Sequence, residues 1–357
     1  MSNPSHADTA IVETGARYTA DVQPAAPPRT PAVAPPPPRR TSQRPGLYVA
    51  MLIATMCVAT GYKLRTNGLF ACDASGYASD RYVAYCQASA YGDYDYGAFW
   101  YGLEPSTRDA AATADVLFVG NSRAQFAFSS SAISNWFKSH LARYYLLGFA
   151  YNGNMAFAEP LLRRLKPRAR VYVISVDLFF RQQPTPPAQE VMRDSAALGK
   201  YREKSAWQLA HRALCTRIAA LCRHDFAYYR RRTDGAWIVA GSGDFRPQPV
   251  AYSDSVDHRV LDSEIALGRE FVSQLPVSRD CVLLTLPAKG TLGPGTSIGT
   301  AKAMAAALGL PLIAPQPDGL TTFDGSHVDR ESAERWSSAF LAAAAPSIEK
   351  CLGQSAP

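Results

Sequence analysis

A serine and a histidine in two separate segments are the residues best suited to carry out chemistry. Ser122 belongs to the segment VLFVGNSR, residues 116–123, and His327 belongs to the segment FDGSHV, residues 323–328. Asp324 precedes His327 by three residues, so a single loop can carry both the imidazole and the carboxylate that fixes its tautomer. Because a serine hydroxyl is a weak nucleophile without a base, we predict that His327 activates Ser122 for nucleophilic catalysis.

The residues before Ser122 predict how the chain positions it. Val116 to Val119 are apolar and β-favouring, and the run stops at Gly120 and Asn121. This pattern is typical of a buried strand that ends in a tight turn into a helix. Ser122 would then lie at the carboxyl edge of a sheet, where the first N–H groups of a helix can stabilise an oxyanion.

Apolar strand patterns alternate with helical patterns through the rest of the chain. Such alternation predicts an α/β fold, with a parallel sheet covered by helices on both faces. Functional sites in these sheets lie beyond the carboxyl ends of the strands, which is where Ser122 falls. The expected strands are residues 116–119, 144–149, 171–176, 282–286 and 311–313, and the expected helices are residues 133–142, 156–165, 261–275, 300–308 and 330–344.

A serine after the first strand and an Asp-x-x-His motif before the last helix resemble the motifs of the SGNH (GDSL-like) hydrolase superfamily. The resemblance covers roughly residues 110–345. It is closest to the membrane-anchored bacterial branch, which includes periplasmic polysaccharide O-acetyltransferases and the D-alanylation protein of teichoic acid. The resemblance implies a three-layer, flavodoxin-like sheet, with Ser122 as nucleophile, His327 as general base and Asp324 as the carboxylate that orients it.

Two glycine-containing blocks of that superfamily are less clear in this chain. The third strand runs directly into Asp177, so the Gly-x-Asn-Asp block has no clean counterpart. Residues 151–154, YNGN, are the nearest equivalent of the block after the second strand. The resemblance therefore implies Asn152, Gly153 and Asn154 as candidate oxyanion or substrate-binding residues.

Arg123 follows the predicted nucleophile and begins the helix with a cation, against the preference of the helix dipole. We consider two roles for this side chain. It could form an ion pair with Asp177, or it could bind a carboxylate of an acyl group or sugar.

The polar residues near the predicted site also have non-catalytic interpretations. Ser122 could begin a helix without taking part in chemistry. Asp324 and Ser326 precede the last expected helix, and Ser326 is the favoured cap for it. A second polar group, residues 254–258, holds two aspartates and a histidine but has no strand to position it, so we interpret it as a surface loop.

The first part of the chain predicts a membrane anchor. Residues 1–46 are rich in proline and alanine, which predicts a disordered cytoplasmic arm. Residues 47–63 are uncharged up to Lys63 and predict a single transmembrane helix; a cleaved signal peptide would instead lie at the extreme amino terminus. Arginines cluster before this span, so the positive-inside rule places the domain after it in the periplasm of a bacterium, anchored in the inner membrane.

The rest of the chain divides into an aromatic-rich connecting segment, residues 64–109, and the α/β domain, residues 110–357. The aromatic stretch 91–102 could line a sugar-binding surface, although packing against the core is the favoured interpretation. Residues 181–250 interrupt the strand and helix pattern. We interpret them as an insertion that serves as a lid, an acceptor platform or a passive excursion.

Cysteine usage agrees with an oxidising compartment. Cys57 lies in the predicted span, which leaves an even number of cysteines in the outer domain and predicts disulfides. The sequence allows several connectivities. Short spacing favours Cys72–Cys86 and Cys215–Cys222, with Cys281 and Cys351 left to join the last helix to the sheet.

The net charge of +7 invites comparison with nucleic-acid-binding proteins. No helix-turn-helix, zinc-finger or RNA-binding signature accompanies the basic residues, so we expect no nucleic-acid partner. A basic face outside the membrane suits anionic headgroups or an acidic polysaccharide, and a solvated loop is the plainer alternative.

These features predict a membrane-anchored periplasmic serine O-acetyltransferase or esterase that acts on a cell-surface or exported polysaccharide through an acyl-serine intermediate. A multi-spanning membrane acyltransferase would supply the acyl group, and we expect no metal or organic cofactor. The alternative is a non-catalytic protein that binds glycan or assembles with a membrane acyltransferase or export complex.

Overall fold

The computed structural model describes residues 44–66, 68–87, 91–243, 245–292 and 294–353. Most of the predicted arm lies outside these residues. The first helix, α1 (Pro45–Thr66), is 22 residues long, or about 33 Å at about 1.5 Å per residue. Residues Pro45–Leu64 have a mean hydropathy of 1.5 and none of them is buried, and α1 is long and apolar enough to cross a membrane. It is longer than the predicted span, because it begins two residues earlier, at Pro45, and continues three residues further, to Thr66.

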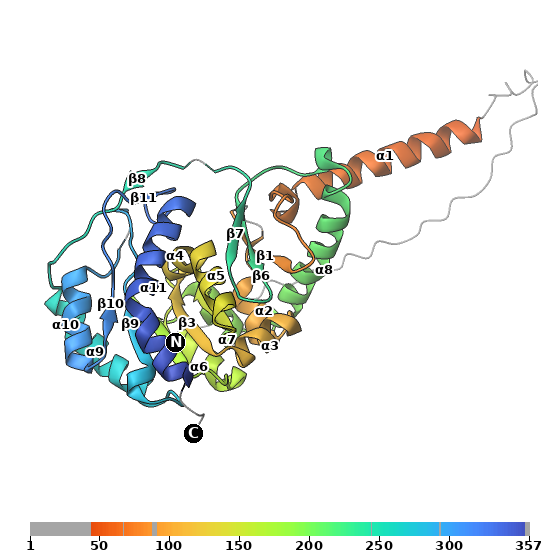
Figure 1. Cartoon of the computed structure of the whole chain (residues 1–357). Helices are drawn as coiled ribbons and strands as arrows, with labels where there is room; N and C mark the ends of the chain where they lie inside the picture. Colours follow the sequence, from red (N-terminus) through yellow and green to blue (C-terminus); the bar gives the residue numbers. More distant parts are fainter. Residues whose placement is uncertain (1–43, 67, 88–90, 244, 293, 354–357) are drawn as a thin grey trace, which may run out of the picture. The chain divides into compact units, whose positions relative to one another are not determined.

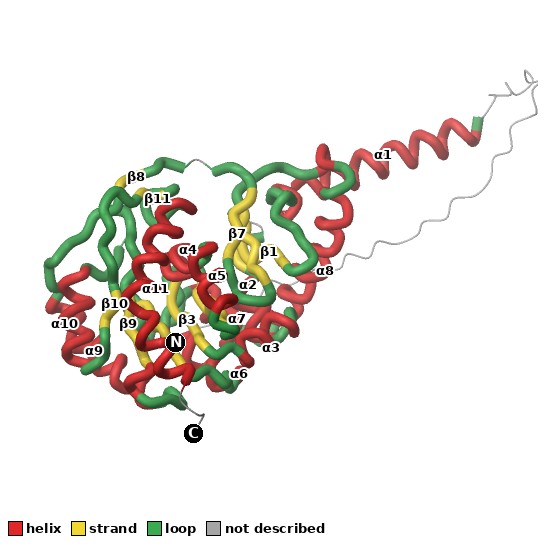
Figure 2. The backbone as a smooth tube through the Cα atoms, in the orientation of Figure 1, coloured by secondary structure: helices red, strands yellow, loops and turns green. Residues whose placement is uncertain are grey.

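A parallel five-stranded sheet forms the centre of the α/β domain (Figures 1 and 2). Its spatial order is β10-β9-β5-β3-β4. Numbered along the chain within this sheet, the order is 2-1-3-4-5, which is a doubly wound arrangement with its switch point between β3 and β5. The strands are β3 (Val116–Asn121), β4 (Tyr144–Phe149), β5 (Val171–Ser175), β9 (Val282–Thr285) and β10 (Leu312–Ile313).

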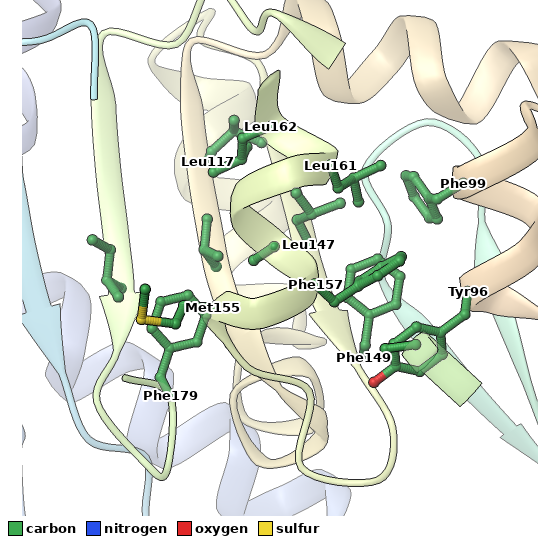
Figure 3. Close-up of a cluster of buried hydrophobic side chains, with 14 of the residues drawn as sticks. Tyr96, Phe99, Leu117, Leu147, Phe149, Met155, Phe157, Leu161, Leu162 and Phe179 are labelled. Atoms are coloured by element: carbon green, nitrogen blue, oxygen red, sulfur yellow. The ribbon is translucent and has the colours of Figure 1, made fainter. Parts of the chain in front are cut away.

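Helices cover both faces of this sheet, because alternate residues of each buried strand point to opposite sides. Leu117 and Val119 pack with α6, α9 and α10, whereas Val116 and Phe118 pack with α4, α5 and α11. Figure 3 shows side chains of the cluster that contains Leu117, where α6 lies over β3 and β4. The helices are α4 (Ser122–Phe128), α5 (Ser131–Ser139), α6 (Met155–Leu165), α9 (His258–Ser273), α10 (Ile298–Leu308) and α11 (Arg330–Gly353). The predicted α/β class and parallel sheet are confirmed.

A second, antiparallel sheet joins two segments that the sequence analysis treated separately. Its order is β2-β1-β6-β7, and β1 pairs with β6. The connecting segment and the predicted insertion therefore fold together. The elements of this region are η1 (Gly68–Ala71), β1 (Arg81–Cys86), β2 (Gly92–Asp93), α2 (Asp95–Tyr101), α3 (Pro105–Thr113), α7 (Pro186–Arg193), α8 (Ala197–Cys215), η2 (Ala219–Leu221), β6 (Ala227–Arg231) and β7 (Trp237–Ala240).

A buried arginine attaches the second sheet to the central one. Arg230 is fully buried, and its Nη2 lies 2.6 Å from Oδ2 of Asp95. The same guanidinium donates hydrogen bonds to the carbonyl groups of Leu146 and Gly148 on β4, at 2.6 and 2.5 Å. Because both partners of the ion pair are buried and hydrogen-bonded, the junction between the sheets is fixed in one geometry.

Most rings of the aromatic stretch pack into the protein interior, whereas Trp100 and Tyr101 are partly buried. Tyr91, Tyr94, Tyr96 and Phe99 are all at most 5% exposed. These four rings therefore belong to the core, which is the interpretation that we favoured. The alternative, that they line a sugar-binding surface, is wrong for these four.

Disulfides join the cysteine pairs that the spacing favoured. They connect Cys72 with Cys86, Cys215 with Cys222, and Cys281 with Cys351. The last pair links the short helix η3 (Arg279–Cys281), which leads into β9, to the carboxyl-terminal part of α11. The short strand β11 (Thr321–Thr322) lies shortly before the His327 loop in the chain and pairs with β8 (Gln248–Pro249).

Candidate active site

The turn after β3 holds Ser122 through its neighbour Asn121. Oδ1 of Asn121 accepts hydrogen bonds from the N–H groups of Arg123 and Ala124, at 3.0 and 3.4 Å, and so caps α4. Its Nδ2 donates to the backbone carbonyl and carboxylate of Asp177, both at 2.9 Å. Asn121 therefore joins the carboxyl ends of β3 and β5 and fixes the turn that carries Ser122.

Gly120 is required by the packing of the same turn. A Cβ at this position would lie 2.7 Å from Cβ of Ser175 and 3.0 Å from Cβ of Ala124. Neither neighbour is a flexible side chain, so any larger residue would push α4 away from β5.

Ser122, His327 and Asp324 form a continuous hydrogen-bonded chain. Oγ of Ser122 lies 2.8 Å from Nε2 of His327, and Nδ1 of His327 lies 2.7 Å from Oδ2 of Asp324. The other oxygen of Asp324 accepts the N–H groups of Ser326 and His327 at 2.9 and 2.8 Å, which fixes the carboxylate in the loop. With Nδ1–H donating to Asp324, Nε2 is left as the acceptor of the serine hydroxyl proton.

The electrostatics of the site keep Asp324 ionised. Burial raises the pKa of the Asp324 carboxyl, but the hydrogen bonds and charge of His327, with the N–H of Ser326, outweigh burial and hold that pKa below its ordinary value. Ser122 is 8% exposed, whereas the side chains of His327 and Asp324 are 18% and 27% exposed. The serine is thus shielded while the base faces a partly open space.

Two phenylalanines confine the imidazole. The ring of Phe126 lies 4.9 Å from that of His327, and the ring of Phe323 lies nearly parallel to it at 5.8 Å. Phe126 and Phe323 are themselves in edge contact at 5.2 Å. This packing limits the orientations of His327 and keeps Nε2 directed at Ser122.

The guanidinium of Arg123 is buried and bonds to other groups of the protein. Its Nη1 forms a buried ion pair with Oδ2 of Asp177 at 2.8 Å and donates to the carbonyl of Pro294 at 2.8 Å. Its Nε donates to Oγ of Ser326 at 3.1 Å. The ion pair that we considered is confirmed, and the alternative contact to a substrate carboxylate is not supported, because these donors already have partners.

Ser326 consequently does not cap the last helix, and that prediction is wrong. Asp329 does so, since its side chain accepts the N–H of Ser332 at 2.8 Å. Ser326 instead links the His327 loop to the Ser122 turn through Arg123.

The candidate oxyanion segment follows β4, next to the Ser122 turn. β4 pairs with β3 so that Phe149 lies opposite Asn121. Asn154 caps α6 by accepting the N–H of Ala156 at 3.1 Å and donates to the carbonyl of Gln183 at 2.9 Å, so both ends of its amide are engaged. The N–H of Gly153 donates to the carbonyl of Ala150 at 3.1 Å. Neither is placed as an oxyanion donor.

Asn152 differs from its neighbours. Its φ of 57° and that of Tyr151, 53°, lie in the left-handed region, which asparagine tolerates better than most residues. It is exposed, and its side chain makes no hydrogen bond within the described part of the chain. Asn152 therefore remains the member of the predicted segment that is available to a substrate.

Two other polar groups are not organised for catalysis. Asp257 caps α9 by accepting the N–H of Arg259 at 3.1 Å, and Asp254 forms an exposed ion pair with Lys302. His211, Cys215 and Cys222 lie together, but the two sulfurs form a disulfide. Both ring nitrogens of His211 also have partners, namely the hydroxyl of Tyr77 and the carbonyl of Cys72, so this group does not offer a ligand set for a metal.

Comparison of the chain with protein-family models, with curated proteins and with solved structures gave no match. The functional inference therefore depends on the geometry of Ser122, His327 and Asp324.

Proposed function

We propose that this protein is a serine acyl-transfer enzyme, with Ser122 as nucleophile, His327 as general base and Asp324 as its orienting carboxylate. The observation that carries the proposal is the unbroken chain from Ser122 Oγ to His327 Nε2 at 2.8 Å and from His327 Nδ1 to Asp324 at 2.7 Å. Three residues from two distant segments meet in the geometry that activates a hydroxyl.

The first half-reaction transfers an acyl group to the enzyme. Oγ of Ser122 attacks the carbonyl carbon of an ester as Nε2 of His327 takes the hydroxyl proton. The Ser122 N–H and the Asn152 side chain are the proposed donors to the oxyanion of the tetrahedral intermediate. The intermediate collapses to acyl-Ser122, and the imidazolium returns its proton to the departing alcohol.

The second half-reaction uses the same groups in reverse order. His327 takes a proton from water or from a sugar hydroxyl as its oxygen attacks the carbonyl carbon of acyl-Ser122. The bond from that carbon to Oγ of Ser122 then breaks, the acyl group leaves on the incoming oxygen, and the imidazolium returns its proton to Oγ. Attack by water makes the protein an esterase, and attack by a sugar hydroxyl makes it an O-acetyltransferase.

The finer assignment is an SGNH-like enzyme with three layers, of the membrane-anchored bacterial branch. The 2-1-3-4-5 strand order, the serine directly after β3 and the Asp-x-x-His motif before α11 support it. In this proposal the acceptor is a cell-surface or exported polysaccharide, and a multi-spanning membrane acyltransferase supplies the acyl group.

The proposed location is the periplasmic side of a bacterial inner membrane. α1 is a candidate span, and arginines cluster before it, which favours a cytoplasmic amino terminus. Three disulfides after α1 agree with an oxidising compartment.

A second candidate function is a non-catalytic glycan-binding or assembly partner with the same fold. It is favoured by one observation: Gly153 and Asn154, which the resemblance implied as oxyanion donors, use their donors within the protein. A folded protein with an inert serine would fit this second candidate.

Ester turnover by the full-length protein in detergent separates these candidates. With p-nitrophenyl acetate, we expect turnover by the native protein and its loss in both Ser122→Ala and His327→Ala. Ser338→Ala, which changes an exposed serine on α11, serves as the matched control and is expected to keep native activity. Equal turnover in all four proteins would exclude Ser122 as the nucleophile.

A further inference from the structure

The segment that follows α1 is held close to the end of the candidate membrane span. That span, Pro45–Leu64, is 20 residues long, or about 30 Å, which matches the hydrocarbon core of a bilayer. η1 begins at Gly68, four residues after Leu64, and four residues reach at most about 14 Å. The headgroup layer is itself roughly 5–8 Å deep on each side of the core. With α1 across the bilayer, η1 therefore lies at the headgroups or just above them.

Helix α8 and the segment after η2 are packed against η1. The ring of Phe70, which is fully buried, lies edge-on to Trp207 at 6.1 Å and to His211 at 5.2 Å, both on α8. The N–H of Arg223, which follows η2, donates to the carbonyl of Phe70 at 2.9 Å. The second half of α8 and η2 are thus held beside the residues that leave the membrane.

The outward face of this region is apolar. Leu209 is 72% exposed and Ile218 is 51% exposed. Ala206 and Ala213 lie three residues before and four residues after Leu209, so they share its side of α8, and both are exposed. The exposed alanines 219 and 220 extend the surface into η2. Neighbouring apolar side chains that face outward mark a surface that contacts a partner or a membrane.

The charges of the same surface are all positive. Residues 204–224 contain no aspartate or glutamate. Arg212 and Arg217 are exposed, and among the residues that the structure describes neither guanidinium has a hydrogen-bond or ion-pair partner. Exposed arginines next to a membrane are attracted to anionic headgroups, and their combination with apolar side chains is typical of helices that lie in the interface.

A disulfide holds the tip of this surface in one conformation. Cys215 at the end of α8 is joined to Cys222 after η2, and the closed loop contains Arg217 and Ile218. Because the disulfide restricts this loop before any contact forms, less conformational entropy is lost when the tip meets another surface.

We propose that residues 206–220 rest on the surface of the membrane that α1 spans and bind anionic phospholipid headgroups there. Arg212 and Arg217 bind the phosphate groups, while Leu209 and Ile218 insert between the headgroups. This second contact limits how far the α/β domain can turn about its anchor. The proposal rests on the proposed membrane location and does not depend on acyl transfer by Ser122.

The test uses the full-length protein in vesicles of phosphatidylglycerol and phosphatidylethanolamine. In a Cys57→Ala background, a fluorescent dye is attached to Leu209→Cys or, as the matched control, to Leu141→Cys, which replaces an exposed leucine soon after α5. Lipids with a nitroxide at the headgroup quench a dye at the membrane surface. We expect quenching at position 209 to be at least about threefold stronger than at position 141, since interfacial helices lie about 5–10 Å deep. Equal quenching at the two positions would overturn the proposal and leave this face to a protein partner.

Variants of the dye-labelled position 209 protein test the role of the cations. Arg212→Gln with Arg217→Gln removes both unpaired charges, and we expect quenching to fall by about half or more. Arg259→Gln with Arg330→Gln, which removes exposed arginines of α9 and α11, is the matched control and is expected to leave quenching unchanged. Replacing phosphatidylglycerol by phosphatidylcholine should have the effect of the first pair. Full quenching in the Arg212 and Arg217 variant would contradict headgroup binding by these residues.

Flotation of the vesicles after a carbonate wash separates this proposal from the proposed location. Protein that floats without selective quenching at position 209 would overturn the surface contact and leave α1 as an anchor. Protein that does not float would contradict the anchor, and the surface contact would fail with it.

Discussion

At the scale of single residues, the proposed nucleophile, Ser122, is positioned by groups that do not react. Asn121 caps α4 and donates to Asp177, Arg123 pairs with Asp177, and Arg123 also donates to Ser326 on the His327 loop. The carboxyl ends of β3 and β5 and the His327 loop are therefore joined by one polar network. Since catalysis depends on placement within a fraction of an ångström, we expect this network to matter for turnover in the proposed mechanism.

Asp324→Asn should keep the fold of the loop and lose most of the activity. The amide can still accept the N–H groups of the loop but does not stabilise the imidazolium or fix its tautomer. We expect kcat for p-nitrophenyl acetate to fall by about 10³- to 10⁴-fold, with little change in the melting temperature. Asp318→Asn, at an exposed position, is the control, and a kcat of Asp324→Asn within threefold of that control would contradict the assigned role.

Arg123→Met tests the polar network. The substitution leaves the carboxylate of Asp177 buried without its cation, so we expect the free energy of unfolding to fall by about 3–5 kcal/mol. Denaturant unfolding of the detergent-solubilised protein measures this loss. Native stability in Arg123→Met would show that Asn121 and the N–H of Thr296, which also donate to Asp177, suffice to hold the turn.

The triad could be predicted from the sequence because its residue types and positions are local signals. A strand pattern ends immediately before Ser122, and Asp324 and His327 share one short loop. The supporting residues could not be predicted in the same way. Phe126, for instance, gains its role only by contact with Phe323, and no periodicity or motif connects two positions so far apart.

At the scale of elements, the site lies where the order of strand addition in the central sheet reverses. The switch point of the sheet falls between β3 and β5, and Ser122 and Asp177 follow these two strands. Each predicted strand of this sheet is present. β3, β4, β5 and β9 are buried throughout, and such a strand reads as a continuous apolar run, whereas β10 is a short, half-buried strand at the edge. The second sheet was missed because the pairing of β1 with β6 joins residues about 150 positions apart, which leaves no local trace in either segment.

The Cys281–Cys351 disulfide fixes α11, the helix that follows the His327 loop. It closes a loop of 70 residues that contains His327 and ties α11 to the start of β9. Replacing both cysteines by alanine is expected to lower the stability by about 4 kcal/mol in the chain-entropy account. Thermal unfolding measures this change; Cys57→Ala, which removes a cysteine outside the disulfides, is the control, and equal melting temperatures for the two variants would contradict the prediction.

Helix α8 carries a buried histidine, His211, that joins it to the segment holding Cys72 and Tyr77 and stays neutral there. Burial lowers the pKa of His211 to about 4, while Tyr77 and Cys72 occupy its ring nitrogens. In the unfolded chain the imidazole takes up a proton below its ordinary pKa of 6.5. The unfolded state therefore binds more protons between about pH 6.5 and pH 4, and stability falls as the pH is lowered through this window.

His211→Gln should reduce that dependence on pH. We expect the native protein to lose stability between pH 7.5 and pH 5, and the variant, which has no titrating group at this position, to lose less. Urea unfolding at the two pH values gives the comparison. An identical difference in both proteins would show that other groups account for the loss.

At the scale of the whole molecule, the chain combines a candidate membrane helix with a disulfide-bonded α/β domain. The sequence predicted both, since an uncharged run of this length and an even number of cysteines after it are global features that need no knowledge of contacts.

We predict that the full-length protein resists extraction from membranes by carbonate. Before reduction, a maleimide should modify Cys57 in the denatured protein and not the six cysteines of the outer domain, and modification of those six without reductant would contradict export.

The measurement that tests the central claim most directly is labelling of the full-length protein by a fluorophosphonate, with the modified residue located by mass spectrometry. We predict one phosphonylated residue, Ser122, in the native protein. Labelling should be lost in His327→Ala, because the hydroxyl 2.8 Å from Nε2 would then have no base. An unlabelled Ser122 in the folded, disulfide-bonded protein would contradict the acyl-serine mechanism.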